Sequence, residues 1–374
     1  MKKRIYFENL DGLRFLCFLS VFLFHGFNTE SPEIKENGVF HFFRWDLLAN
    51  GNLGVNFFFV LSGFLITFLL IEEKKLNGQI SLKKFWIRRI LRIWPLYYLC
   101  VFFGFLIFPW LKHLFGETPN ETANPWYYLT FTNNFDLIHK GLPDASSLAV
   151  LWSVAIEEQF YLVWPIILFI FPVKKLWIPF VIIISTSLIF RAVHDNATLN
   201  EHHTLSCIGD MAIGAAGAWL IGVSARFKKY IENFSKVQII LIYVIFILAY
   251  LFRDEILFST FALRIFERMF IAILIILIIL EQCFSKKSLF KMSSFKRISM
   301  FGVISYGLYC LHPICILVAN TLAKKLSLNI HLWQLALVEV PLALILTIIA
   351  SKLSFKYFET PFLKIKEKFS YITK

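Results

Sequence analysis

The sequence predicts an all-α, polytopic integral membrane protein with about ten transmembrane helices and both termini in the cytoplasm. Three observations predict this fold class. Hydrophobic residues make up 58% of the chain and charged residues only 17%, whereas a soluble domain is about 45–50% apolar and about 25% charged. The apolar residues form long runs, and one bilayer crossing needs about 20 such residues. Lys and Arg gather in alternate loops, which orients a membrane protein by the positive-inside rule.

Ten apolar runs are the candidate membrane spans. They cover roughly residues 10–28, 52–71, 90–111, 151–172, 176–193, 204–223, 237–252, 258–280, 299–320 and 333–357. The fourth run contains two carboxylates, Glu157 and Glu158. The aromatic-rich stretch 123–138 is predicted to be an interfacial or re-entrant segment.

The basic residues set the predicted orientation. With the N-terminus in the cytoplasm, the segments on that side hold 26 of the 38 Lys and Arg residues, and the opposite side holds 8. This asymmetry explains the net charge of +13 without a nucleic-acid partner. No basic patch interleaved with aromatic residues is present, so we exclude nucleic-acid binding. The longest outer loop, 112–150, is large enough to cover a site.

The chain is predicted to form a single membrane domain over residues 1–374, with no appended soluble domain. Its basic N-terminus followed by an apolar run imitates a signal peptide. Asp11 and Arg14 interrupt that run and no cleavage site follows, so we interpret it as a retained first helix. The six cysteines show no metal-ligand spacing and are interpreted as buried apolar residues. No metal cofactor is predicted.

Arg14 and His25 are ionisable residues inside the first span, where such residues are costly and often functional. Eleven residues are close to three helical turns, so the two side chains share one helix face and lie about 16 Å apart along the axis. Arg14 is expected near the cytoplasmic entrance and His25 toward the outer leaflet. The alternative is a snorkelling arginine and a histidine that caps the outer end.

Arg88, Arg89 and Arg92 form a basic cluster at the start of the third span. Spacings of three and four residues place Arg92 beside both others on one helix face. Such a cluster can be a positive-inside anchor. Guanidinium groups also pair bidentately with phosphate oxygens, so a polyphosphate ligand is the alternative partner.

The fourth span places Ser153, Glu157 and Tyr161 at intervals of one helical turn. This pattern predicts either a structural polar network between helices or a carboxylate that orients a histidine or a substrate hydroxyl.

Other polar residues receive structural interpretations. His312, next to Pro313, is interpreted as structural or interfacial. Arg264, Glu267 and Arg268 are expected to form a satisfied ion pair within the membrane. Asp210 and the small residues at 214, 218 and 222 are expected at a helix-packing face.

These segments together resemble acyltransferase family 3, a group of membrane proteins that includes surface-polysaccharide O-acetyltransferases. Most of the chain takes part, and the motifs keep the family's order. They are Leu10–Arg14 with His25, Gly54–Phe64, Phe85–Pro95, Trp152–Tyr161, Ser305–Pro313 and Phe358–Pro361. One position departs from the pattern: the family often has aspartate where Asn56 stands. Asn56 is therefore a polar packing contact, or the acceptor of this member differs.

The resemblance implies transfer of an acyl group, commonly acetyl, from cytoplasmic acyl-CoA to a hydroxyl of a surface or exported saccharide. Arg88, Arg89 and Arg92 would bind the CoA phosphates, and Arg14 would extend the same positive region. His25 would be the general base, with Glu157 or Glu158 orienting its ring. The implied partners are acyl-CoA, a saccharide such as a polysaccharide, lipopolysaccharide or lipid-linked glycan, and membrane lipid. The implied location is a bacterial cytoplasmic membrane.

Two other functions fit a polytopic chain. A transporter of a glycan or lipid-linked sugar would also use charges within the membrane, but such proteins usually show internal repeats with broken helices, and none is visible here. A non-catalytic partner of glycan enzymes would not need buried charge, so Arg14, His25 and Arg92 count against it.

Overall fold

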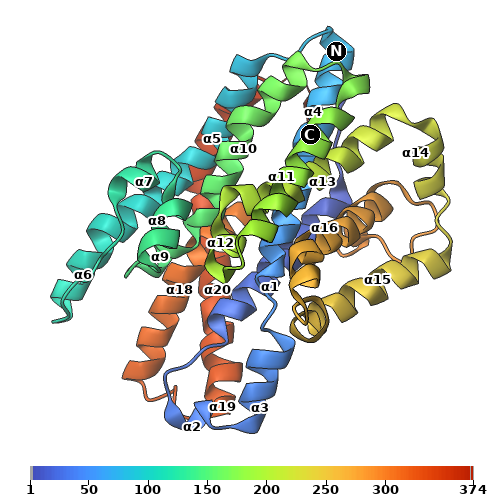
Figure 1. The fold of residues 1–374 in the computed structure, drawn as a ribbon. Helices are drawn as coiled ribbons and strands as arrows, with labels where there is room; N and C mark the ends of the chain where they lie inside the picture. The colour runs from blue at the N-terminus through green and yellow to red at the C-terminus, as the bar shows by residue number, and fades with distance from the viewer. Residues whose placement is uncertain (1–2, 371, 374) are drawn as a thin grey trace.

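The computed structural model describes residues 3–370 and 372–373. Helices dominate it, which confirms the predicted all-α class. The only extended pairing within the described residues joins β1 (Lys3–Arg4) to β2 (Ile372–Thr373) in parallel. The two ends of the chain therefore lie side by side at one end of the molecule (Figure 1).

Each of the ten predicted spans coincides with a long helix or a run of joined helices. The long helices are α1 (Glu8–Gly26), α4 (Leu53–Asn77), α5 (Leu82–Phe102), α10 (Leu151–Ile170), α11 (Trp177–Val193), α13 (Thr204–Val223), α15 (Lys236–Leu251), α16 (Phe261–Phe284), α18 (Ser305–Lys325) and α20 (Val340–Leu353).

Short helical segments join or extend them. They are α2 (Pro32–Lys35), α3 (Gly38–His41), η1 (Phe42–Leu47), η2 (Phe103–Ile107), α6 (Phe108–Leu114), α7 (Pro125–Leu129), α8 (Asn133–Lys140), α9 (Ser146–Ala149), η3 (Val173–Lys175), α12 (Ala197–His202), α14 (Ala225–Glu232), η4 (Arg253–Leu257), η5 (Met292–Ser294), α17 (Lys296–Val303), α19 (Leu332–Gln334), η6 (Leu335–Glu339), η7 (Ser354–Glu359) and α21 (Thr360–Glu367). The predicted interfacial stretch 123–138 corresponds to the short helices α7 and α8.

Among the described residues, seven helical stretches are long and apolar enough to cross a membrane, or eight if α14 and α15, bent by 87°, form one span. Helices α1 and α16 also match predicted spans but fall outside this set. Both contain several charged residues, such as Arg14 in α1 and Arg268 in α16. The multi-span membrane architecture is thus supported, and the total of about ten stays a prediction.

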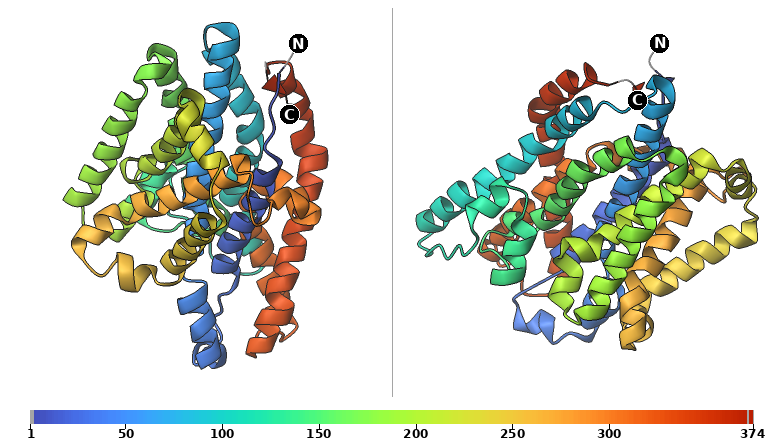
Figure 2. Two further views of the ribbon diagram at one scale, coloured as in Figure 1. Left: turned by 90° about the vertical axis from the view of Figure 1, so that its right-hand side faces the viewer. Right: turned by 45° about the horizontal axis from the view of Figure 1, so that its top comes forward.

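Helices α4 and α13 make the most extensive helix–helix contact among the described residues, and glycines lie at their crossing. A Cβ atom added at Gly214 would clash with the backbone oxygen of Val60, and one added at Gly63 would clash with the backbone of Met211. Small residues let two helix backbones approach in this way. The predicted packing role of Gly214 is confirmed, and α4 is held in the middle of the bundle against α1, α10, α13 and α16 (Figure 2).

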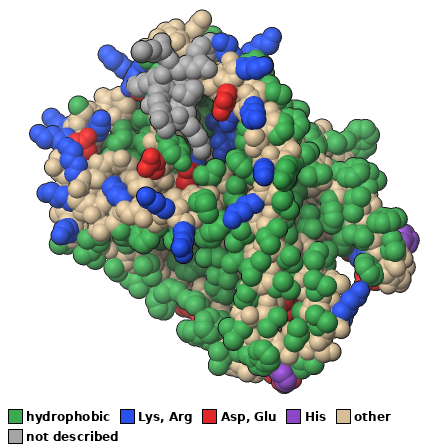
Figure 3. Space-filling model, turned by 180° about the vertical axis from the view of Figure 1, so that it is seen from behind, with side chains coloured by type: hydrophobic (Ala, Val, Ile, Leu, Met, Phe, Trp, Pro, Cys, Tyr) green, Lys and Arg blue, Asp and Glu red, His purple; other side chains and the backbone are tan. Residues whose placement is uncertain are grey.

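The surface shows the same charge asymmetry as the sequence. On the face drawn in Figure 3, Lys and Arg gather around the end that holds the termini, and hydrophobic side chains cover most of the remainder. An apolar belt below a basic end is the arrangement that the positive-inside rule favours. Placement of this end in the cytoplasm remains a prediction.

Candidate active site

A pocket lies among α1, α4, α5, α10 and α18, toward the end of the molecule that holds the termini. It has an empty volume of about 1260 Å³, part of it continuous with solvent. Three of the five helices contain an internal proline, namely Pro95, Pro165 and Pro313. Proline removes one backbone hydrogen bond and bends a helix, which helps these helices diverge around a space. The polar side chains of the lining are Tyr6, Arg14, Ser62, Arg89, Arg92, Ser153, Glu157, Tyr161, Ser305, Tyr306 and Tyr309.

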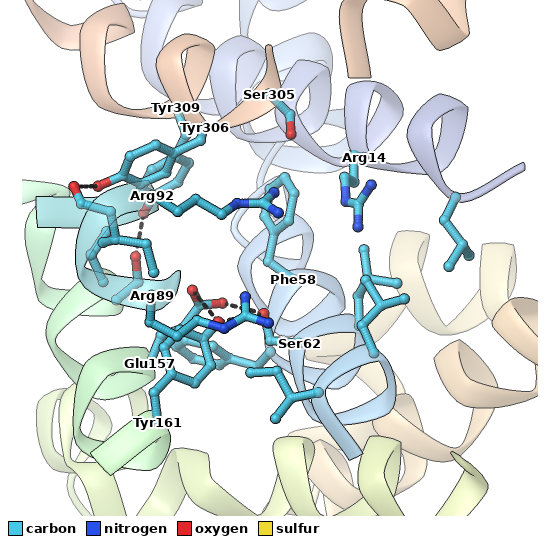
Figure 4. Close-up of a pocket in the computed structure, with 18 of the residues that line it drawn as sticks. Arg14, Phe58, Ser62, Arg89, Arg92, Glu157, Tyr161, Ser305, Tyr306 and Tyr309 are labelled. Atoms are coloured by element: carbon cyan, nitrogen blue, oxygen red, sulfur yellow. Dashed lines mark hydrogen bonds between the residues drawn. The ribbon is translucent and has the colours of Figure 1, made fainter. Parts of the chain in front are cut away.

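Three of the four predicted CoA-binding arginines meet in this pocket. Arg14 enters from α1, and Arg89 and Arg92 enter from α5 (Figure 4). The spacing of three residues between Arg89 and Arg92 brings both to the same face of α5. The structure therefore joins two sequence motifs that are about 75 residues apart into one positive lining.

The charge of this lining is only partly neutralised. Arg14 pairs with the buried carboxylate of Asp11, which also accepts a hydrogen bond from Tyr6. Within the described residues, Arg89 and Arg92 have no ion-pair partner within 4 Å, and the Nε of Arg89 is buried without a hydrogen bond. The Arg89 guanidinium instead lies 5.4 Å from the ring centroid of Tyr161. Two free guanidinium groups facing one pocket predict an anionic ligand.

Arg88 does not belong to the pocket. Its guanidinium donates to Glu73 Oε2 at 3.1 Å and to the backbone oxygen of Phe369 at 2.9 Å. It therefore connects α5 to the C-terminal segment. The expectation that Arg88 contributes to the same ligand site as Arg89 and Arg92 has no geometric support here.

Glu157 lies in the pocket wall at the centre of a hydrogen-bond ring. Ser62 Oγ donates to Glu157 Oε1 at 2.7 Å, and Tyr161 OH donates to Glu157 Oε2 at 2.9 Å. Tyr161 OH also lies 3.0 Å from Ser62 Oγ. Glu157 thus binds α4 to α10 and places a carboxylate opposite the arginines (Figure 4). Ser62 was not selected from the sequence, although the motif Gly54–Phe64 contains it.

Glu158 points to a different neighbour. Its Oε2 accepts a hydrogen bond from Trp94 Nε1 at 2.9 Å, and its Oε1 is buried with no partner among the described residues. It is absent from the pocket lining. Adjacent residues on a helix point about 100° apart, which is why the two glutamates separate.

Tyr309 of α18 forms part of the pocket wall. Its hydroxyl lies 2.7 Å from Ser153 Oγ and donates to the Val150 backbone oxygen at 3.0 Å. Tyr309 was not among the residues selected from the sequence, although the motif Ser305–Pro313 contains it.

His25 lies away from this pocket, near the end of α1. Its side chain is exposed, and its ring centroid is 5.3 Å from that of His312. No hydrogen bond within the described residues joins His25 to Glu157 or Glu158, so neither carboxylate is placed to orient the imidazole. His312, which the sequence interpretation treated as structural, is the buried neighbour instead.

A second polar cluster consists of buried ion pairs. Arg268 Nε donates to Asp210 Oδ2 at 2.8 Å, and Glu267 pairs with Arg191 and Arg253. The expected charges of α16 are thus in ion pairs, but with residues of other elements rather than with one another, and Arg264 pairs with Asp195 at 2.9 Å. Asn56 donates to the same Asp210 oxygen at 3.2 Å, which supports its interpretation as a packing contact.

A family model described as an acyltransferase domain matches residues 7–354. The chain belongs to acyltransferase family 3. The match confirms the resemblance that the motifs predicted and favours an enzyme over a transporter. Within the described residues, no group of three or more His, Cys, Asp or Glu side chains could hold a metal ion.

Individual relatives of this family member are bacterial proteins. This chain is 31% identical to the peptidoglycan O-acetyltransferase OatA of Listeria monocytogenes, over 96% of this chain and 56% of that protein. It is 27% identical to a putative peptidoglycan O-acetyltransferase of Bacillus subtilis, over 95% of this chain and 55% of that protein. A putative O-acetyltransferase of Staphylococcus aureus is also 27% identical, over 97% of this chain and 58% of that protein. The chain thus spans a little over half the length of these relatives. No solved structure matches it.

Proposed function

We propose that this acyltransferase is an O-acetyltransferase that takes an acetyl group from acetyl-CoA and delivers it to a saccharide hydroxyl on the other side of the membrane. The strongest support comes from Arg89 and Arg92. Their guanidinium groups have no ion-pair partner among the described residues, and both face a pocket that opens near the termini. A CoA phosphate group would supply the missing anion. No metal takes part in the proposed reaction.

The transfer itself needs one base. The hydroxyl oxygen of the acceptor attacks the thioester carbonyl, and His25 takes the hydroxyl proton. The carbon–sulfur bond then breaks, the acetyl group stays on the acceptor oxygen, and the sulfur leaves as a thiolate that takes the proton back from His25 to give free CoA. In this scheme Glu157 stabilises the pocket through Ser62 and Tyr161, since neither glutamate contacts His25. Glu158 is left as a buried carboxylate bonded to Trp94.

The acceptor class rests on the relatives. Two of them carry names that specify peptidoglycan, which is a saccharide polymer. We infer a cell-wall or other surface glycan as the acceptor, and the bacterial cytoplasmic membrane as the location. Membrane lipid is then the solvent of the apolar belt.

Acetyl transfer by the purified protein in liposomes tests this proposal. Radiolabelled acetyl-CoA is supplied on one side with soluble peptidoglycan glycan fragments on the other, and label in the glycan is counted. His25→Gln keeps side-chain size but removes the proton acceptor, so turnover is expected to fall by about 10²–10⁴-fold. Acetyl-CoA binding to the same sample is expected to stay within about twofold, since the pocket does not include His25.

The matched control is His139→Gln, which changes an exposed histidine of α8 and is expected to leave turnover unchanged. Near-wild-type turnover of His25→Gln would remove His25 from the mechanism. If the wild-type protein transfers no label from acetyl-CoA, the donor assignment is wrong. Movement of unmodified glycan across the liposome membrane would instead identify a transporter.

A further inference from the structure

The end of α1 that is farthest from the pocket opening holds a second group of polar side chains with unused hydrogen-bonding capacity. His25 and His312 meet there with their ring centroids 5.3 Å apart. Arg44 of η1 lies over the Phe24 ring at 4.9 Å, and the Phe24 ring lies 5.1 Å from that of His25. Arg44 is thus linked to His25 through the Phe24 ring, while His312 contacts the His25 ring directly.

The hydrogen-bonding role of His312 can be deduced from its contacts. His312 Nδ1 lies 2.6 Å from the backbone oxygen of Tyr309. A carbonyl oxygen only accepts, so Nδ1 carries the hydrogen, and Nε2 of the neutral ring is an acceptor. Nε2 is buried and no donor reaches it within the described residues. An unsatisfied buried acceptor is unfavourable, so this position calls for a hydroxyl or N–H donor.

Arg44 has the opposite requirement. Its Nε and NH1 atoms are buried, and neither has an acceptor among the described residues. The guanidinium is held between aromatic rings, with the Trp45 centroid 4.7 Å away and the Phe24 centroid 4.9 Å away. The rings fix its position but supply no oxygen. Arg44 therefore calls for acceptor atoms.

These two requirements together select one class of ligand. A phosphodiester or an ionised carboxylate group would satisfy Arg44 but has no hydrogen to donate to His312. A sugar with neighbouring hydroxyl groups donates through one O–H and accepts through the next oxygen, so it satisfies both. We propose that His312 and Arg44 form the acceptor subsite, which binds hydroxyl groups of one saccharide beside His25.

The position of this subsite relative to the donor pocket supports the assignment. The side chain of Tyr309 lines the pocket, while its backbone oxygen holds His312 one helical turn further along α18. Residues three apart on a helix are neighbours. The acceptor subsite at His312 and the part of the donor pocket wall formed by Tyr309 are thus separated by a single turn of one helix. This inference rests on the proposed acyl transfer for its biological meaning, and binding alone can test it.

The test measures equilibrium binding of tetra-N-acetylchitotetraose, a soluble N-acetylglucosamine oligosaccharide, to the purified full chain without any acyl donor. Arg44→Gln removes the two unused donors of the guanidinium. His312→Phe removes the acceptor and suits the aromatic surroundings of Phe18 and Phe22. Each variant is expected to weaken saccharide binding by about tenfold or more. Acetyl-CoA binding, measured on the same samples, is expected to remain within about twofold and reports that the variants are folded.

Lys35→Gln, which removes an exposed cation of the preceding helix α2, is the matched control and is expected to bind the saccharide as the wild type does. His312→Gln returns an acceptor oxygen and is expected to recover part of the affinity lost in His312→Phe. The inference is overturned if the wild type does not bind the saccharide, or if both Arg44→Gln and His312→Phe bind it unchanged. If the wild type binds the saccharide through these residues but transfers no acetyl group, the proposed function is contradicted and the inference about the saccharide subsite still holds.

Discussion

At the scale of single residues, partners distinguish three arginines that lie on one helix within five positions. Arg88 is engaged by Glu73 and by the backbone of Phe369, whereas Arg89 and Arg92 face the pocket without an ion-pair partner among the described residues. A paired arginine stabilises the fold, and an unpaired one is available for a ligand. The sequence could place the three on nearby faces but could not say which one Glu73 would reach.

This difference predicts how CoA affinity responds to substitution. Arg92→Gln is expected to weaken acetyl-CoA binding, because each charge-assisted contact contributes about 1.5–3 kcal/mol. Arg92→Lys is expected to recover only part of the affinity, since an ammonium cannot form the bidentate contact. Arg88→Gln is the control and is expected to leave the dissociation constant nearly unchanged. Equal losses in Arg88→Gln and Arg92→Gln, measured by isothermal titration on folded protein, would argue against the assignment.

The buried pair of Arg268 and Asp210 predicts a stability effect. Arg268→Gln leaves the Asp210 carboxylate buried without its cation, which typically costs about 3–5 kcal/mol. A clear drop in the thermal unfolding temperature in detergent is expected. The double variant Arg268→Gln/Asp210→Asn removes both charges and is expected to recover most of the loss. A double variant no more stable than Arg268→Gln would show that the pairing does not explain the effect.

At the scale of helices, the site depends on how closely α4 approaches its neighbours. Ser62 and Phe58 reach the pocket from one face of α4, while Gly63 on another face meets the backbone of α13. The glycines therefore set the depth at which α4 presents Ser62 to Glu157.

A matched pair of substitutions tests this packing. Gly214→Ala places a Cβ against the backbone of Val60, which cannot move aside easily, so a destabilisation of about 1–3 kcal/mol is expected. Gly222→Ala lies on the same helix but meets Ile71 Cγ2 at 3.7 Å, an ordinary contact. Its other neighbour, the flexible Lys75 Nζ, is also 3.7 Å away. The substitution is expected to be neutral or slightly stabilising, because alanine favours helix formation. Thermal unfolding of both variants is the measurement, and similar melting temperatures would contradict the close approach.

At the scale of the whole molecule, the chain brings its two ends together through the contact of β1 with β2. Ends on one side of a membrane require an even number of crossings, which ten spans satisfy. The pocket that contains Arg89 and Arg92 lies toward this end, and the proposed subsite of His312 and Arg44 lies toward the other. An acyl carrier and its acceptor could thus approach from opposite sides.

The predicted orientation can be measured directly. In a cysteine-free background, Asn120→Cys in the 112–150 loop is expected to react with a membrane-impermeant thiol reagent added outside intact cells. Lys229→Cys in α14 is expected to react only after permeabilisation. The side of the membrane that holds 26 of the 38 basic residues is predicted to be cytoplasmic, and α14 is on that side. Both positions are exposed in the structure, so access does not limit labelling. The reverse pattern would invert the topology.

The sequence by itself determined the all-α class, the positions of the long helices and the family, because long apolar runs and linear motifs are local features of the chain. It also placed Arg14, Arg89, Arg92 and Glu157 among the candidates. Only the tertiary structure decided which of these share a pocket. Arg88 and Glu158 turn to Glu73 and Trp94, and His25 meets His312 rather than a glutamate, since each of these pairs joins two different helices. Helix periodicity fixes the direction of a side chain around its own axis, and the packing of neighbouring helices decides what that side chain contacts.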